Sequence, residues 1–253
     1  MRLPGMTATG AVARRAIESL PRGLARQGAP LLGRVAGLGS PDAQLAIRRY
    51  GALAAAYDRR TAAGSAYRRR SVLALAPAPG EVIVDVGCGT GLNFALVQEG
   101  IGRRGRLVGV DASAEMLERA RARVRAEGWR NVTLLHAAAG DAEVDAPADG
   151  ALLCGVHDVM RSPAALANVL RQLRPGGRIV AGGPKWAPWW RPGGMVLNLS
   201  TRSVNRDFVT TFEGFDRPWS ALERLVGDLA VEEVMFGAGY IARGELPRGL
   251  ARE

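Results

Sequence analysis

Cysteine is scarce in this sequence, since Cys88 and Cys154 are the only two in 253 residues. Two thiols are too few for a disulfide framework or a cysteine-based zinc site, so we expect a cytoplasmic protein without a metal. Long uncharged runs are missing too: no window of about 18 residues lacks a charged side chain, which argues against a membrane-spanning helix. The remaining composition, 47% hydrophobic and 23% charged, is typical of a folded domain and excludes wholesale disorder.

Acidic side chains are rare in the first third of the chain. Residues 1–80 hold 13 basic and three acidic side chains, whereas residues 81–253 hold 21 of each, so the net charge of +10 lies near the N-terminus. Prolines and glycines interrupt residues 1–39, which predicts a basic, poorly structured leader ahead of one domain at 40–253. Such a leader can resemble a transit peptide, make a peripheral contact with an anionic membrane, or touch only its own domain.

Two helices are expected before the pattern of apolar residues changes. Ser40 supplies an N-cap, Pro41 the first helical position and Asp42 an acid in the first turn, so a helix should run from here toward Tyr57. A second helix is predicted over Ser65–Leu75, ending before a proline-rich turn.

Short apolar runs then alternate with helical segments. Strands are predicted at residues 82–86, 107–110, 132–135, 151–155 and 178–181, with helices at 92–99, 113–127 and 163–173 and a turn at 175–177. This alternation is typical of right-handed βαβ units. Residues 231–236 and 240–243 predict a terminal hairpin. The expected fold is a doubly wound α/β fold: a mostly parallel, seven-stranded sheet with one antiparallel strand near the C-terminus and helices on both faces.

The loop after the first strand, with the sequence DVGCGTG, is the most informative segment. The dinucleotide fingerprint G-x-G-x-x-G fails here, because Leu92 stands three residues after Gly89. A carboxylate at Asp85 would repel a pyrophosphate and favour a ligand with an ammonium group. Asp111 ends the second strand 20 residues after Gly91, where it can accept hydrogen bonds from both ribose hydroxyls. These features predict a nucleoside ligand with a cationic, phosphate-free tail.

Three segments, VDVGCGTG, VGVDASAEMLERAR and LRPGGRIV, closely resemble the class I S-adenosylmethionine-dependent methyltransferases, over about residues 45 to 245. The resemblance implies a Rossmann-like fold and S-adenosylmethionine as the cofactor. It also implies a cofactor site in which Gly87, Cys88, Gly89 and Gly91 surround the methionine moiety, Asp85 reaches its amino group directly or through water, Asp111 holds the ribose, and Ala112 and Met116 flank the adenine.

The adenine contact departs from the family pattern. Family members often carry G-D-A after the third strand, whereas the matching positions here are alanines at 137–139, and Gly140-Asp141-Ala142 follows three residues later. Either Asp141 reaches back to the adenine, which we favour slightly, or backbone groups near Ala138 read it.

The acceptor is expected at the carboxyl end of the fourth strand, where His157 and Asp158 follow. His157 is the candidate general base, although we favour a histidine that caps the next helix or packs beside the pocket. Residues 184–217 form an insertion too long for an ordinary connection, so they are expected on the acceptor side. Its tryptophans, Trp186, Trp189 and Trp190, either face an apolar acceptor or form a satellite core under the loop.

The leading functional hypothesis is methyl transfer to a small, apolar, lipid-like or natural-product acceptor. The alternative is an RNA methyltransferase that uses the basic leader as a backbone clamp. The balanced charge of residues 81–253 and the lack of an N/D-P-P-Y/F motif disfavour nucleic acid. A fold that binds the cofactor only for regulation is a third, unsupported interpretation.

Overall fold

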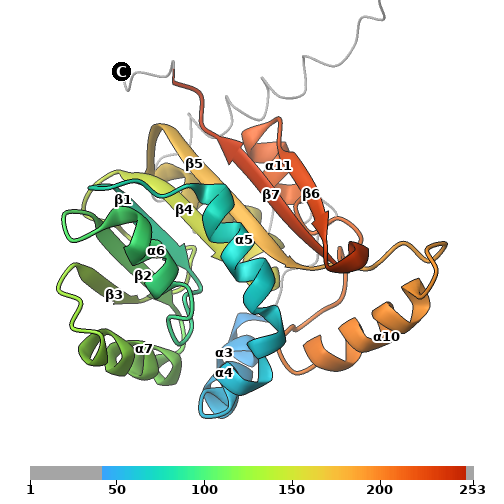
Figure 1. Ribbon diagram of the computed structural model, residues 1–253. Coiled ribbons are helices and arrows are strands. Elements are labelled where there is room, and N and C mark those ends of the chain that lie inside the picture. Colours follow the sequence, from blue (N-terminus) through green and yellow to red (C-terminus); the bar gives the residue numbers. More distant parts are fainter. Residues whose placement is uncertain (1–41, 249–253) are drawn as a thin grey trace, which may run out of the picture.

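The computed structural model describes residues 42–248, and these form a seven-stranded sheet in the order β3-β2-β1-β4-β5-β7-β6 (Figure 1). The strands are β1 (Val82–Val86), β2 (Arg106–Asp111), β3 (Val132–His136), β4 (Ala148–Cys154), β5 (Leu173–Pro184), β6 (Ala230–Val234) and β7 (Gly239–Glu245). Strands β1 to β5 pair in parallel, whereas β7 runs antiparallel to both β5 and β6. The predicted mostly parallel sheet with one antiparallel strand is therefore confirmed.

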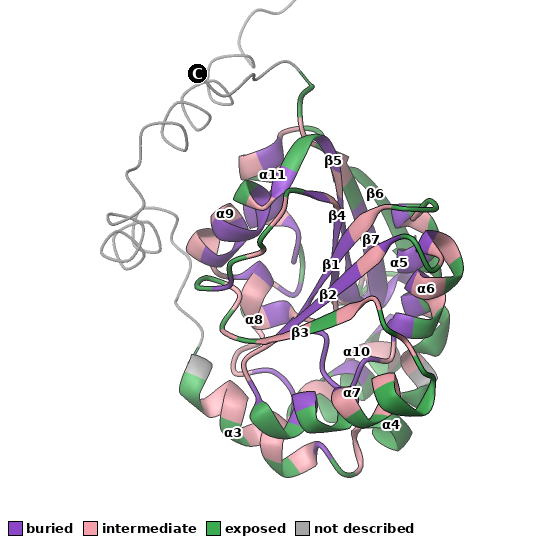
Figure 2. Cartoon of the chain, turned by 90° about the vertical axis from the view of Figure 1, so that its left-hand side faces the viewer, coloured by how far each residue is buried: buried purple, intermediate pink, exposed green. Residues whose placement is uncertain are grey.

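Helices cover both faces of this sheet (Figure 2). One face carries α5 (Ser65–Leu75), α6 (Phe94–Ile101) and α7 (Ala114–Ala126), and the other carries α9 (Pro163–Arg171) and α11 (Ser220–Val226). Successive side chains of a strand point to opposite faces, so Ile83 joins the core under α5 and α6 while Val84 joins the core under α9 and α11. The apolar run of β1 is thus buried on both sides.

The first predicted helix is wrong in length. It divides into α3 (Ala43–Leu53) and the single turn α4 (Tyr57–Arg60), followed by the 3₁₀ turn η1 (Ala62–Gly64). Asp42 is itself the N-cap, because its carboxylate accepts a hydrogen bond from the Leu45 N–H at 2.8 Å. The break lets α4 turn toward the glycine loop, and no local sequence pattern predicts this contact between α4 and the loop. The leader at 1–39, Ser40 and Pro41 lie outside the described residues.

The turn predicted at 175–177 does not precede the fifth strand but lies inside it, within β5. The chain bulges there: Ala148 pairs with Leu173, but Gly150 pairs with Arg178. The Gly176 N–H donates to the Leu246 carbonyl at 3.1 Å, so the bulge is held by the C-terminal end of the described chain. The remaining helices are α8 (His157–Met160), α10 (Gly194–Asn205) and the turn η2 (Met235–Gly237). Among residues 42–248, no helix is both long and apolar enough to cross a membrane.

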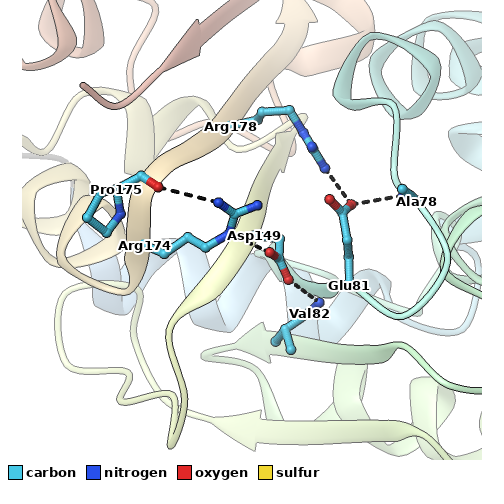
Figure 3. A network of polar contacts seen from close by, with 7 residues as sticks. All are labelled: Ala78, Glu81, Val82, Asp149, Arg174, Pro175 and Arg178. Atoms are coloured by element: carbon cyan, nitrogen blue, oxygen red, sulfur yellow. Dashed lines mark hydrogen bonds and ion pairs between the residues drawn. The ribbon is translucent and has the colours of Figure 1, made fainter. Parts of the chain in front are cut away.

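A polar network joins β1, β4 and β5 near the amino ends of β1 and β4 (Figure 3). The Glu81 carboxylate accepts hydrogen bonds from the Arg178 guanidinium and from the Ala78 N–H. The Asp149 carboxylate accepts one from the Val82 N–H at 2.8 Å and another from the Arg174 guanidinium. The side chains of Glu81 and Asp149 are 14% and 20% exposed, so both carboxylates are largely buried. They fix the amino ends of these strands, opposite the carboxyl ends where ligands bind in such folds.

We expect Glu81→Gln to lower the free energy of unfolding by about 1–3 kcal/mol, because hydrogen bonds to a shielded charge are lost. The matched control is Asp145→Asn, which breaks a similar pair with Arg106 where the Asp145 side chain is 77% exposed. That change should have little effect. Urea unfolding of both variants tests the difference, and equal stabilities would show that the network does not stabilise the sheet.

Candidate functional site

A cavity of about 560 Å³ opens at the carboxyl ends of β1, β2 and β4. This is where the strand order reverses, since the chain continues to β2 on one side of β1 and returns to β4 on the other. Its wall includes the glycine loop, Asp111 to Ser113 after β2, residues 137–141 after β3, and residues 155–159 after β4. The parallel sheet therefore gathers four separate loops around one space.

The three glycines of the loop after β1 all have positive φ, at +65° for Gly87, +56° for Gly89 and +80° for Gly91. A Cβ at Gly87 would lie 2.3 Å from the Val156 side chain, and one at Gly91 would lie 2.7 Å from the Phe94 ring. Packing thus excludes side chains at these two positions, beyond the backbone strain. At Gly89 the nearest neighbour is 3.8 Å away, because this residue faces the cavity.

The predicted contacts of the glycine loop divide into two groups. Gly87 and Gly89 line the cavity, as expected for residues that surround the methionine moiety. Cys88 and Gly91 lie behind the wall: Cys88 is buried in the core under α6, and its N–H donates to the Val110 carbonyl at 2.9 Å. Burial raises the pKa of the Cys88 thiol, so this side chain behaves as a small core residue.

Asp111 connects the two loops that frame the cavity. Its Oδ2 accepts a hydrogen bond from the Gly89 N–H and its Oδ1 accepts one from the Ser113 N–H, each at 2.8 Å. Burial raises the pKa of Asp111, while these backbone donors lower it. Each carboxylate oxygen keeps a further lone pair, and the residue lines the cavity. Asp111 can therefore still accept the ribose hydroxyls assigned to it from the sequence.

Asp85 lies farther from the cavity than expected. It points to the α6 side of β1, is fully buried, and accepts hydrogen bonds from the Asn93 amide at 3.2 and 3.1 Å. Burial raises the pKa of Asp85 to about 7, while the Asn93 hydrogen bond lowers it. In this arrangement Asp85 supports the loop from behind, so the water-mediated form of the predicted amino-group contact fits better than the direct one. Sequence analysis missed Asn93, which follows the last loop glycine by two residues.

The adenine side of the cavity keeps both predicted alternatives open. Ala112, Ala138 and Asp141 all line the wall. Residues 138–142 form a tight turn, in which the Asp141 N–H donates to the Ala138 carbonyl at 2.9 Å. The Asn168 amide fixes this turn by donating to the carbonyls at 139 and 142. Met116, in contrast, is 1% exposed and belongs to the core beneath the wall.

Helix α3 covers the other end of the cavity, through Ala46, Ile47 and Tyr50. The Arg49 guanidinium donates to the Val209 carbonyl at 2.6 Å, which ties α3 to the insertion. Asp58 of α4 accepts from the Thr90 hydroxyl at 2.6 Å and forms an ion pair with Arg123 at 2.7 Å, which ties α4 to the glycine loop and α7. We call α3 and α4 together the roof. Local sequence patterns do not indicate this role, because the contacts of the roof join residues far apart in the chain.

His157 lines the cavity as predicted, but its environment favours the neutral ring. It is 6% exposed, lies 4.3 Å from Phe215 between ring centroids, and has Nε2 at 3.0 Å from the Glu213 carbonyl. A carbonyl only accepts, so we assign the proton to Nε2 and leave Nδ1 as a bare acceptor. Burial lowers the pKa of His157 to about 4. The Nδ1 atom has no partner among the described residues.

The three tryptophans of the insertion lie outside the cavity. Trp186 stacks on Phe212 with ring centroids 5.4 Å apart and contacts Phe215 at 5.2 Å, so it forms the satellite core that was the alternative prediction. Trp189 and Trp190 are 81% and 70% exposed. None of the three lines the cavity, so an acceptor-side role for these tryptophans stays a prediction that this geometry does not support.

Comparisons with known proteins agree with this geometry. The sequence model of a family described as a methyltransferase domain matches residues 83–177. A demethylmenaquinone methyltransferase of Beutenbergia cavernae is 30% identical over 183 residues, which cover 69% of this chain and 71% of that protein. The chain belongs to the class I S-adenosylmethionine-dependent methyltransferases. The predicted family and its cofactor, S-adenosylmethionine, are thereby confirmed.

Other relatives of this methyltransferase match over shorter stretches. A trans-aconitate 2-methyltransferase of Pseudomonas paraeruginosa is 38% identical over 138 residues, covering 48% of this chain and 46% of that protein. An uncharacterised protein of transposon TN4556 from Streptomyces fradiae is 35% identical, and the match covers 50% of this chain and 36% of that protein. The chain thus spans about a third to a half of these two proteins.

Among solved structures, the methyltransferase fold recurs at low sequence identity. A chain in the complex of the Haloferax volcanii Trm112 methyltransferase activator with a methyltransferase aligns with a TM-score of 0.59 and 17% identity, over 78% of this chain and 97% of that one. An O-methyltransferase of Thermotoga maritima aligns with a TM-score of 0.51 and 16% identity, over 72% and 64%. These likenesses support the fold alone.

We expect Asp111→Asn to weaken binding of S-adenosylhomocysteine tenfold to a hundredfold, equivalent to about 1.5–3 kcal/mol, because a charged acceptor is lost. Calorimetric titration measures the change, with thermal unfolding of the free variant as the check on folding. Asp141→Ala in the same assay separates the two adenine alternatives, since only a side-chain contact would be lost. Full affinity in Asp111→Asn would refute the ribose assignment.

A second expectation concerns Asp85 and pH. Because its pKa is raised in the folded protein, the stability it contributes is fully present below about pH 4, where the unfolded chain is also protonated, and is lost as the pH rises to about 7. Asp85→Asn removes this loss, so its unfolding free energy relative to the wild type should improve between pH 4 and pH 8. Denaturant unfolding at several pH values tests this, and parallel profiles for the two proteins would contradict it.

Proposed function

We propose that this methyltransferase acts on a small, mostly apolar acceptor that binds in the cavity beneath the roof. The observation that carries the proposal is the continuity of the cavity, which extends from Gly89 and Asp111 to Ile47 and Tyr50 of α3. Its volume of about 560 Å³ lies within the range of small-molecule sites. The residues proposed for the cofactor and those proposed for the acceptor thus line one continuous cavity.

The wall at the roof end favours an uncharged acceptor. Ala46 and Ile47 are apolar, and burial raises the pKa of Tyr50 well above its usual value and that of Tyr57 to about 12, so both phenols stay neutral. His157 is neutral as well, because burial lowers its pKa to about 4. Polar groups at this end come from His157, Asp158 and Arg161, so a mainly apolar molecule with a few polar atoms fits this surface.

When bound, S-adenosylmethionine supplies an activated methyl group on a positively charged sulfur. Transfer removes this charge, so the protein needs no group that stabilises a new anion, and alignment of the reactants can supply about 7–11 kcal/mol. Gly89 and Asp111 position the cofactor end of the cavity. The contacts of Arg49 with Val209 and of Asp58 with Thr90 hold the roof over the acceptor end.

The relatives support a small-molecule acceptor. By their names, two of them methylate demethylmenaquinone and trans-aconitate, although this chain covers 71% of the first protein and 46% of the second. An RNA acceptor is not favoured, because the positive excess lies in residues 1–80 while residues 81–253 are balanced. The apolar side chains of Ala46 and Ile47 at the roof end of the cavity also suit a small apolar molecule better than a polyanion.

The proposal is tested with S-adenosylmethionine carrying a labelled methyl group, incubated with the full chain and separate quinone, lipid and RNA preparations. We expect label in a product that extracts into organic solvent, and tenfold to a hundredfold less label with Asp111→Asn at a cofactor concentration limiting for that variant. Label found only in RNA would overturn the proposal.

Once the acceptor is known, His157→Gln defines the role of the histidine. An amine acceptor with a free lone pair should be methylated at nearly the wild-type rate. A phenol or hydroxyl acceptor should lose about 10²–10⁴-fold if Nδ1 takes the proton. A phenol methylated at full rate by the variant would leave His157 with a purely structural role.

A further inference from the structure

An apolar surface lies on α10 and on the loop before it, separate from the cavity. It consists of Trp189, Trp190, Met195, Val196 and Leu199, whose exposed fractions are 81, 70, 74, 70 and 64%. We call these five residues the α10 surface. Figure 1 shows α10 at the periphery of the molecule, beyond the turn that joins β6 and β7. Exposed patches of this kind mark sites of interaction with other molecules.

The orientation of α10 is set by polar contacts on its inner side. The Asn198 side chain accepts a hydrogen bond from the Ala187 N–H at 2.7 Å and donates one to the Ala187 carbonyl at 3.0 Å. Thr201, on the same side of the helix, is buried. Surface helices normally turn their apolar stripe toward the core, but here Met195, Val196 and Leu199 point outward. The outward apolar face is therefore a fixed feature of the fold.

The turn η2 extends the α10 surface. Phe236 is 86% exposed and has a φ of +55°, which is unusual for a residue with a side chain. A Cβ at its neighbour Gly237 would lie 3.1 Å from the Pro188 side chain, so η2 packs against the residues that lead into Trp189. Phe236, Trp189 and Trp190 thus lie at the same end of the molecule.

The charge near the α10 surface distinguishes two candidate partners, a second copy of the chain and an anionic lipid bilayer. Residues 186–206 contain Arg191, Arg202 and Arg206 and no aspartate or glutamate. Arg191 pairs with Glu233 at 3.2 Å, and Arg202 lies over the Phe212 ring. Arg206, whose side chain is 71% exposed, pairs with Asp207 at 3.8 Å. If two copies met through α10, arginines would oppose arginines, which is unfavourable. An anionic lipid bilayer instead offers phosphate groups to the arginines and an apolar interior to the other side chains.

We propose that the α10 surface docks the enzyme on an anionic lipid bilayer. Tryptophan is favoured at the boundary between lipid and water, and a helix with an outward apolar face and basic residues lies in the plane of that boundary. Arg49 of the roof also donates to the Arg206 carbonyl at 3.3 Å, just after the end of α10. Docking therefore brings the roof of the cavity near the lipid. The proposal concerns binding and holds whatever the acceptor is.

The test is co-sedimentation of the full chain with vesicles of phosphatidylcholine alone or with added phosphatidylglycerol, at low and high salt. We expect binding to the anionic vesicles that weakens with salt. Replacing both tryptophans, Trp189→Ser with Trp190→Ser, should lower the partition coefficient on the order of tenfold or more, because each ring loses its burial in lipid. Leu199→Ser should lower it by a smaller factor. Leu73→Ser on α5 is the matched control, since Leu73 and Leu199 are both 64% exposed.

Two results would overturn the proposal. Vesicle binding that is unchanged in the double tryptophan variant would place any membrane contact elsewhere, such as in the basic leader. The other result is a dimer, seen by sedimentation velocity without vesicles, that the double variant abolishes. Together with no binding to anionic lipid, it would assign the surface to a second copy of the chain. Titration with S-adenosylhomocysteine confirms that each variant is folded, and it keeps this test separate from that of the acceptor.

Discussion

The carboxylate of Asp111 holds together the part of the molecule where the chemistry is expected. One oxygen accepts from the Gly89 N–H and the other from the Ser113 N–H, so one side chain fixes both the curvature of the glycine loop and the start of α7. The strand behind it is equally constrained, since a Cβ at Gly109 would meet Phe94 and Cys88 at about 3 Å. The cofactor end of the cavity is thus shaped before any ligand arrives, which lowers the entropy cost of binding.

Several buried polar atoms without partners among the described residues lie around this site, and others belong to Arg106 and Arg178 at the amino ends of the strands. Those around the site include Nδ1 of His157, Oδ2 of Asp158 and Oδ1 of Asn93, and the first two belong to residues that line the cavity. Each such atom costs stability, because it has lost its water without gaining a protein partner. At the amino ends of the strands, Glu81 and Asp149 each make two hydrogen bonds, although Nε of Arg178 has no partner there within residues 42–248. The cavity differs in that its unpartnered atoms, in His157 and Asp158, belong to residues that line a space for ligands.

The insertion after β5 has two faces with different roles. Inward, Trp186 packs with Phe212 and Phe215, and Lys185, which is 4% exposed, pairs with Glu233 of β6 and so anchors the segment to the sheet. Outward, it presents the α10 surface. Its far end reaches the roof, where Arg49 and Val209 meet although they lie 160 residues apart in sequence. Surface and cavity are therefore joined by one continuous structural element.

The sequence by itself determined what depends on neighbours in the chain. The strand at Val82–Val86, the helix at Ser65–Leu75, the cap at Ser113 and the glycine loop all follow from local patterns, because backbone conformation and strand burial are set within a few residues. The roof, the displacement of Asp85 behind the wall and the outward turn of the tryptophans were decided only by the tertiary structure. Each depends on contacts with a distant residue that local patterns do not specify, such as Val209 for Arg49. Trp186 and Trp189 lie three residues apart in sequence, and they differ in burial only because the fold presents one to a core and the other to solvent.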